Sequence, residues 1–271
     1  MPFVERGETS LYYESHGEGP AILLVHGVGA NHGIWYRQFE QLSSSYRLIV
    51  PDQRGFGLST DAEGLGRAAF GDDLAAILDH AGIDRAAVVG QSMGGGSAVS
   101  LADQHPSRVA ALVLASTLHG LAETAPVAAL MDAARAETES LGQIERVLGE
   151  AHRIRNPDDA RLYAVLSSFN RIRRGQIPGE WPRLVPAEEL GGRFPILFLS
   201  ALQDRVFPAA AIAGMQAQVA GSYLAEIDSG HSAFFEDPAT FNDAILSFLM
   251  AAGWRGARRP KHSNAAGYVA P

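Results

Sequence analysis

The sequence has 271 residues, of which 46% are hydrophobic and 19% are charged, and it carries a formal net charge of −8 at pH 7. This composition is typical of a globular chain with a sizeable apolar core, and the acidic balance argues against nucleic acid as a partner. The chain has no cysteine, which excludes disulfides and thiolate catalysis, and it shows neither a signal peptide nor the roughly 18 apolar residues of a membrane span, so we expect a cytoplasmic protein without membrane contact.

Along the chain, weak alternation over residues 9–17 predicts an antiparallel edge strand. Near-continuous Val, Ile and Leu then predict strands buried on both faces of a parallel sheet. These runs span residues 21–27, 46–52, 86–92, 109–116, 195–201 and 222–228. Helical patterns cover residues 68–83, 96–106 and 238–253. The alternation of strand and helix predicts an α/β fold with right-handed crossovers.

The alternation breaks between residues 120 and 190, where helical patterns follow one another with no strand between them. We interpret this segment as a helical cap inserted into a core domain of residues 1–119 and 191–253. The polar, basic residues 254–271 have no periodicity, and we expect a flexible C-terminal tail.

Around Ser92, an apolar run passes directly into glycines in the stretch VVGQSMGGG. The part from Gly90 to Gly94 fits G-x-S-x-G, the strand–turn–helix "nucleophile elbow" that exposes a serine hydroxyl on a strained turn. The motif alone is weak, but the strand before it and the helix after it supply the expected context. We also expect Gly95 and Gly96 to let the helix pack closely on the sheet.

A serine nucleophile needs a base that is oriented by an acid. With this elbow the chain order is Ser, acid, His, each at the end of a later strand. Asp204 follows the run 195–201 and His231 follows the run 222–228, so both fit in order and place. Asp228 and Glu236 are rival acids, although both lie close enough to His231 in sequence for turn or capping roles.

An oxyanion hole requires two backbone N–H groups aimed at the charge that develops in the transition state. Met93, directly after the serine, offers one, and Val28 in the loop HGVG offers the other. His26 and His32 flank this loop, and we interpret both as loop-stabilising residues rather than catalytic ones.

Four motifs, HGVG, DQRGFGLS, GQSMGG and GHSAFFEDP, together resemble the α/β-hydrolase superfamily over about residues 8–252. The resemblance implies an eight-stranded, mostly parallel sheet, a helical cap after the sixth strand and a Ser92–His231–Asp204 triad, with no metal or organic cofactor. It also implies that Asp52 and Arg54 hold loops.

Within the superfamily, serine at the elbow argues against haloalkane dehalogenases and epoxide hydrolases, which use aspartate. Carbon–carbon bond hydrolases of ring-fission products commonly have asparagine before the serine and tryptophan after the histidine, where this chain has Gln91 and Ser232. GQSMGG also resembles the enol-lactonases and cofactor-free haloperoxidases. We therefore favour a carboxylic ester or lactone hydrolase, with a carbon–carbon hydrolase or a hydrolase-fold ligand receptor as alternatives.

The expected partner is a small to medium, largely apolar molecule enclosed by the cap; the sequence does not decide the oligomeric state. Apolar and aromatic residues of the cap are expected to face Val28, Met93 and Phe207, although each could instead form the cap's own core. They are Leu130, Met131, Tyr163, Leu166, Phe169 and Trp181. Arg171, Arg173 and Arg174 fit a solvated helix end better than a carboxylate site.

Overall fold

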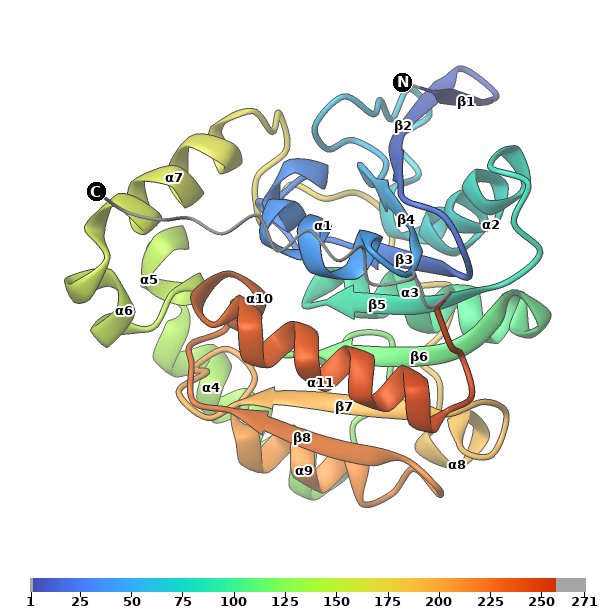
Figure 1. Ribbon diagram of the computed structural model, residues 1–271. Helices are drawn as coiled ribbons and strands as arrows, with labels where there is room; N and C mark the ends of the chain where they lie inside the picture. Colours follow the sequence, from blue (N-terminus) through green and yellow to red (C-terminus); the bar gives the residue numbers. More distant parts are fainter. Residues whose placement is uncertain (1, 257–271) are drawn as a thin grey trace, which may run out of the picture.

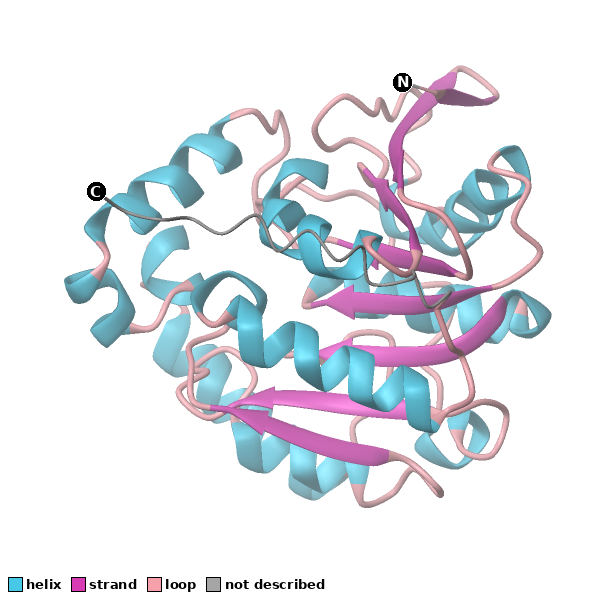
Figure 2. Cartoon of the chain, in the orientation of Figure 1, coloured by secondary structure: helices cyan, strands magenta, loops and turns pink. Residues whose placement is uncertain are grey.

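The computed structural model describes residues 2–256, which form an eight-stranded sheet flanked by helices (Figures 1 and 2). The strand order is β1-β2-β4-β3-β5-β6-β7-β8; β1 and β2 run antiparallel to their neighbours and the rest are parallel. The strands are Phe3–Arg6, Thr9–His16, Ala21–Val25, Arg47–Pro51, Ala86–Gln91, Val109–Ala115, Ile196–Ala201 and Tyr223–Ile227. The predicted fold class is confirmed.

Helices cover both faces of the sheet (Figure 1). On one face lie α2 (Phe70–His80), α3 (Met93–Gln104) and α9 (Ala209–Gln216). On the other lie α1 (Tyr36–Ser43) and α11 (Pro238–Ala251), the latter preceded by the short α10 (Ala233–Glu236). Single 3-10 turns occur at His32–Trp35, Gly66–Ala68 and Pro106–Arg108.

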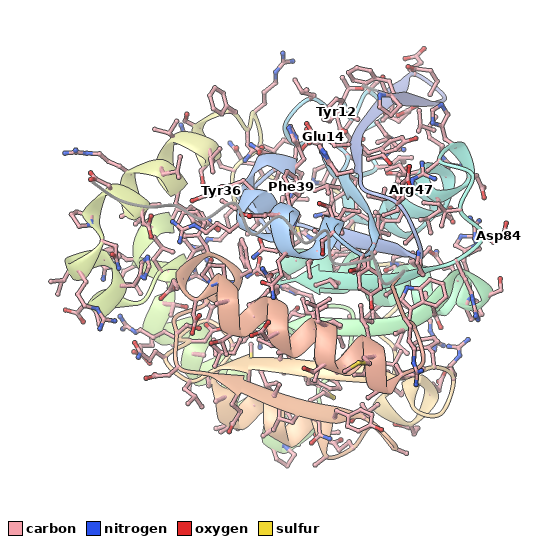
Figure 3. The ribbon with its side chains drawn as sticks, in the orientation of Figure 1. Tyr12, Glu14, Tyr36, Phe39, Arg47 and Asp84 are labelled. Carbon is pink, nitrogen blue, oxygen red and sulfur yellow. The ribbon has the colours of Figure 1, made fainter. Side chains whose placement is uncertain are left out.

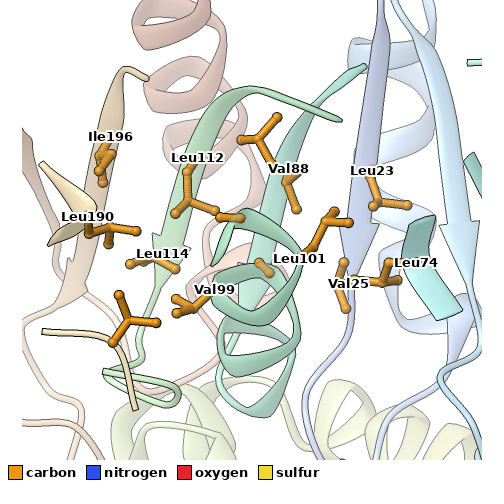
Figure 4. Close-up of a cluster of buried hydrophobic side chains, with 14 of the residues drawn as sticks. Leu23, Val25, Leu74, Val88, Val99, Leu101, Leu112, Leu114, Leu190 and Ile196 are labelled. Carbon is orange, nitrogen blue, oxygen red and sulfur yellow. The ribbon is translucent and has the colours of Figure 1, made fainter. Parts of the chain in front are cut away.

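Each central strand sends alternate side chains into two separate apolar clusters, because successive residues of a strand point to opposite faces. Leu23 and Val25 of β3 pack on the side of α2 and α3, whereas Ile22 and Leu24 pack on the side of α1 and α11. Figure 4 shows the first cluster, in which Leu23, Val25, Val88 and Leu112 meet Leu74, Val99 and Leu101. Two-sided burial explains why these strands read as unbroken apolar runs.

Three sequence expectations need correction at element boundaries. The strand over residues 9–16 is antiparallel, but the sheet edge is β1, which pairs with it. At the other edge, β8 is mostly exposed rather than buried on both faces, because no strand lies beyond it. Helix α3 begins at Met93, three residues before the expected start at Gly96, because Ser92 itself is the N-cap.

A helical segment connects β6 to β7. Its helices are α4 Ala125–Thr138, α5 Gln143–Val147, α6 Glu150–Arg155, α7 Pro157–Ser168 and α8 Ala187–Leu190. Helices α4 to α7 lie toward the carboxyl ends of the parallel strands, and α8 lies near the amino end of β7 (Figure 1). Gly142, Gly149 and Asn156 stand at the N-caps of α5, α6 and α7 and divide the long helical patterns. Within the segment's described residues the only β pairing is a bridge between Leu121 and Val185.

The chain leaves α11 through Trp254, which is fixed to the core. Its indole N–H donates to the carbonyl of Ala21 at 3.0 Å, and its carbonyl accepts from the Tyr46 hydroxyl at 2.9 Å. Most of the predicted tail lies outside the described residues. Over residues 2–256, none of the helices combines the length and hydrophobicity that crossing a bilayer requires.

Candidate active site

Ser92 occupies the turn between β5 and α3. Its backbone has φ 52° and ψ −122°, a region that residues other than glycine rarely adopt. The surroundings hold this conformation: the Ser92 N–H donates to the Ala115 carbonyl at 3.0 Å, and the Ser92 carbonyl accepts from Gly95 N at 2.9 Å and Thr117 Oγ1 at 2.6 Å. The strained elbow thus rests on the ends of β6 and α3.

Two glycines around the turn are required by close contacts. A Cβ on Gly94 would lie 2.2 Å from the carbonyl oxygen of Val25 and 2.6 Å from that of His26, so the elbow and the end of β3 approach backbone to backbone. A Cβ on Gly96 would lie 2.4 Å from the Trp181 ring. Gly96 therefore makes room for the helical segment rather than for the sheet, which corrects its expected role.

His231 and Asp204 meet at the ends of β8 and β7. His231 Nδ1 and Asp204 Oδ2 are 2.8 Å apart, and both side chains are almost fully buried. The second carboxylate oxygen of Asp204 accepts from Val206 N at 2.7 Å and Phe207 N at 3.0 Å. With Asp204 fully hydrogen-bonded as an anion, the geometry favours the tautomer in which Nδ1 carries the proton and Nε2 is free to accept one.

Neither rival acid lies against the histidine ring. Asp228 is exposed and accepts from Gln203 Nε2 at 2.7 Å. The Glu236 carboxylate accepts from Gly149 N and Gly230 N, each at 3.0 Å, and so ties the loop before α6 to the loop that carries His231. Both carboxylates therefore serve turns.

Ser92 and His231 line the same cavity, which has a volume of about 260 Å³ and lies between the strand ends and the helical segment. The Phe207 ring stacks on the His231 ring with centroids 5.8 Å apart and an interplanar angle of 15°. Across the described part of the chain no hydrogen bond joins the Ser92 hydroxyl to His231. Such contacts often tighten only in the substrate complex.

The two expected oxyanion donors, Val28 and Met93, also line this cavity. Met93 is the first residue of α3, so its N–H has no acceptor within the helix. No group among residues 2–256 accepts a hydrogen bond from either amide. The Val28 carbonyl, in contrast, accepts from Gln143 Nε2 of α5 at 3.1 Å, which fixes the orientation of the Val28–Gly29 peptide.

Hydrogen bonds from buried polar side chains stabilise the loop that carries Val28. His26 Nδ1 lies 2.8 Å from the Gly27 carbonyl and its Nε2 accepts from Gln53 N at 3.0 Å, and full burial lowers the pKa of His26. Asp52 Oδ1 lies 2.8 Å from His32 Nδ1. Neither histidine faces the cavity, in keeping with loop-stabilising roles.

The bracing continues to the antiparallel strand β2. His32 Nε2 is 3.6 Å from Glu14, and Tyr12 donates its hydroxyl proton to Glu14 at 3.0 Å. Tyr12 and Glu14, labelled in Figure 3, share one face of β2. Arg54 holds a neighbouring loop through two bonds to Asp73, at 2.7 and 2.8 Å.

The structure divides the residues expected to face the substrate. Met131, Tyr163 and Phe207 line the cavity. Leu130 and Phe169 do not: they are 40% and 65% exposed, Leu130 on the outer side of α4 and Phe169 just after the end of α7.

Two further residues expected in the pocket wall pack elsewhere. Leu166 packs against the core beside α1, and Trp181 packs against Phe70 and Gly96. Neither lines the cavity. Both side chains therefore contribute to packing, which was the alternative given for each of them in the sequence analysis.

The prediction of an apolar cavity wall is wrong for one side of the cavity. Four arginines, Arg67, Arg135, Arg146 and Arg174, line it together with Glu123. Of these four, only Arg174 was considered in the sequence analysis, where it was interpreted as part of a solvated helix end. Arginine on a short amphipathic helix usually faces solvent, so no local pattern distinguishes Arg146 from its exposed neighbours.

His119 also lines the cavity and was missed in the sequence, although its position just after β6 is where parallel sheets gather their site residues. Its ring packs edge-on against Phe207, with centroids 5.2 Å apart. Its side chain is partly exposed, and it lines the cavity beside Ser92. Burial, with smaller effects from the charges of Arg67 and His231, lowers the pKa of His119 to about 4.

Because His119 is held neutral, stability should depend on pH. Its pKa falls from 6.5 to about 4 on folding, so between these values the unfolded chain binds more protons and stability decreases as pH falls. We expect the loss of stability between pH 7 and pH 4.5 to be smaller in His119→Gln, measured by urea unfolding. An identical loss in both proteins would contradict this account, since His26 contributes equally to each.

Over residues 2–256, no group of three or more His, Asp or Glu side chains is arranged to hold a metal ion. The charged clusters of the site are the Asp204–His231 pair and the arginine-lined wall.

Comparison with known proteins gives consistent matches. A family model described as "alpha/beta hydrolase fold" matches residues 20–159. Among solved structures, Est816, described as an N-acyl homoserine lactone degrading enzyme, is 27% identical with a TM-score of 0.76, covering 91% of this chain and 100% of its own. A thermophilic esterase from Thermogutta terrifontis is 25% identical with a TM-score of 0.74, covering 92% and 97%. The putative carbamate hydrolase RutD of Caulobacter vibrioides is 26% identical over 269 residues, covering 89% of this chain and 96% of its own.

Proposed function

Since the chain belongs to the α/β-hydrolase fold family, we propose that it is a serine hydrolase that cleaves a small to medium carboxylic ester or lactone through an acyl-enzyme intermediate. One observation carries this proposal: His231, hydrogen-bonded to Asp204, lines the same cavity as Ser92 at its strained elbow. A nucleophile and a base therefore border one cavity, and an acid behind the base orients it.

In the first half of the reaction, Ser92 Oγ attacks the carbonyl carbon and its proton passes to His231 Nε2. The carbonyl oxygen gains negative charge, which the Val28 and Met93 amides stabilise. The bond to the leaving oxygen then breaks, and His231 returns the proton to that oxygen. A lactone opens at the same bond and keeps its alcohol on the acyl chain.

In the second half, water attacks the acyl carbon and gives a proton to His231, and the ester bond to Ser92 breaks as that proton returns to Oγ. Asp204 stays ionised throughout and holds the His231 ring in position. Gln143 is a positioning residue for this loop, because its bond to the Val28 carbonyl holds the Val28–Gly29 peptide, which directly follows the peptide that carries the Val28 N–H.

We further propose that residues 120–190 act as a cap on a core of residues 1–119 and 191–253. Cavity-lining residues from this segment, including Met131, Gln143 and Tyr163, support the assignment. A cavity of only about 260 Å³ favours short acyl groups over polymers or long lipids, because a pocket of this size surrounds most of a small substrate.

The proposal is tested by turnover of short-chain esters, lactones and ring-fission products, with Ser92→Ala as the blank. We expect Ser92-dependent hydrolysis of esters or lactones and slower hydrolysis of long-chain esters. Turnover of ring-fission products alone would indicate a carbon–carbon hydrolase. Tight binding of a small molecule without turnover of any substrate would indicate a receptor and would overturn the proposal.

A further inference from the structure

The cavity wall has a charge opposite to that of the protein as a whole. The chain carries a formal net charge of −8, yet the cavity beside Ser92 is lined by four arginines and one glutamate. Most of the surface of an acidic chain carries negative charge, so an excess of cations around one cavity is a local feature that favours an anion.

One arginine of the wall is already neutralised. Arg135 pairs with Glu123 at 2.5 Å and with Asp132 at 2.7 Å. For Arg67, Arg146 and Arg174, no carboxylate of the described residues lies within 4.0 Å of the guanidinium nitrogens. Three uncompensated cations therefore border the space in which the substrate would lie.

Two of these guanidinium groups are held in place by backbone carbonyls. Arg67 Nη1 donates to the carbonyls of Ile177 and Gly179, each at 3.0 Å. Arg146 Nη1 donates to the Thr138 carbonyl. A guanidinium has five N–H donors, so each group is anchored through one nitrogen while other donors remain for a ligand.

The charge of Arg174 acts directly on Arg146. Burial lowers the pKa of Arg146, and the nearby Arg174 lowers it further, against the opposing effect of Asp204. The two arginines also line a second cavity of about 460 Å³, which shares Gln143 with the first. They therefore stand where the two cavities adjoin, and an anion there would relieve their repulsion.

We propose that Arg146 and Arg174, supported by Arg67, bind a carboxylate of the substrate, which is then the half-ester of a dicarboxylic acid or a lactone bearing a carboxylate. This inference rests on the proposed function and specifies its substrate class. The planar guanidinium matches a carboxylate in shape and in paired hydrogen bonds. The scissile carbonyl lies at Ser92, while the second carboxylate is unreactive and fixes the orientation of the acyl chain.

The test compares two esters of equal chain length that differ only in the terminal group, monomethyl glutarate and methyl pentanoate. The measured quantity is the ratio of their kcat/KM values at pH 7.5. Hydrolysis is monitored by titrating the acid that it releases. We expect the wild type to favour the anionic ester by about tenfold or more, since hydrogen bonds between a guanidinium and a carboxylate are stronger than those between neutral groups. Arg174→Gln and Arg146→Gln should each lower this ratio by about tenfold.

Matched controls separate this inference from simpler effects. Arg171→Gln removes a charge from the same segment between α7 and α8. Because Arg171 is exposed and lines neither cavity, the ratio of the two kcat/KM values should not change. Arg174→Lys keeps the charge without the paired donors and should give an intermediate ratio. Arg174 is itself exposed, so its substitution should leave the fold intact even if Arg146→Gln weakens the contact with Thr138.

Each failure has a distinct form. Hydrolysis of both esters with a wild-type ratio near one would overturn the carboxylate site and leave the hydrolase proposal standing. A ratio that favours the anion but is unchanged in all arginine variants would also overturn it. Loss of Ser92-dependent hydrolysis for every ester would instead overturn the proposed function.

Discussion

Replacing Ser92 by Ala or Gly is expected to lower kcat by about 10⁴-fold or more, because loss of the nucleophile leaves only binding and the oxyanion donors. The two variants should differ in stability. Ser92 has φ 52°, a conformation that strains any side chain and costs about 1 to 3 kcal/mol, so Ser92→Gly should unfold at a higher urea concentration than Ser92→Ala.

The control for this pair is Ser100→Ala. Ser100 is buried in the same helix, α3, but does not line the cavity, so this variant should keep its turnover. Normal turnover in Ser92→Ala, or equal urea midpoints for the Ala and Gly variants, would contradict the assignment of a strained nucleophile.

Asp204→Asn should lower kcat by about 10³- to 10⁴-fold while the protein stays folded. The asparagine oxygen can still accept from Val206 N and Phe207 N, which preserves the loop. Its amide group then faces His231 Nδ1 as a donor, where Asp204 is an acceptor at 2.8 Å. The imidazole must accept at Nδ1 and carry its proton on Nε2, where it cannot act as the base.

Asp228→Asn is the matched comparison, because Asp228 lies near His231 in sequence yet contacts Gln203 instead. We expect steady-state turnover of a short ester to be near wild type in this variant. Near wild-type turnover in Asp204→Asn together with an inactive Asp228→Asn would reverse the roles of the two acids.

The parts of the fold that the sequence predicts well are those governed by short-range patterns. Continuous apolar runs indicated every parallel strand, because burial on both faces leaves no polar side of a strand to show. The elbow could also be predicted from a local pattern, because a close backbone contact such as that at Gly94 excludes any side chain and so requires glycine.

What the sequence could not predict depends on partners far away in the chain. The run that forms β8 was grouped with the buried strands, but β8 is mostly exposed because the sheet ends there. In the helical segment, the face of each helix that meets the core depends on how the helices pack, which no local pattern gives. Leu130 and Phe169 were therefore expected to face inward, and the short helix α5 gave no sign that Arg146 lines the cavity.

Ser92 is proposed as the covalent nucleophile, with His231 as its base and Asp204 as the acid that orients the base. The most direct test of this assignment is treatment of the native protein with a fluorophosphonate, followed by digestion and mass spectrometry of the peptides. We expect one adduct, on the peptide that contains Ser92, formed with loss of activity and formed far more slowly in Asp204→Asn. An adduct on another residue, or full labelling with activity retained, would contradict it.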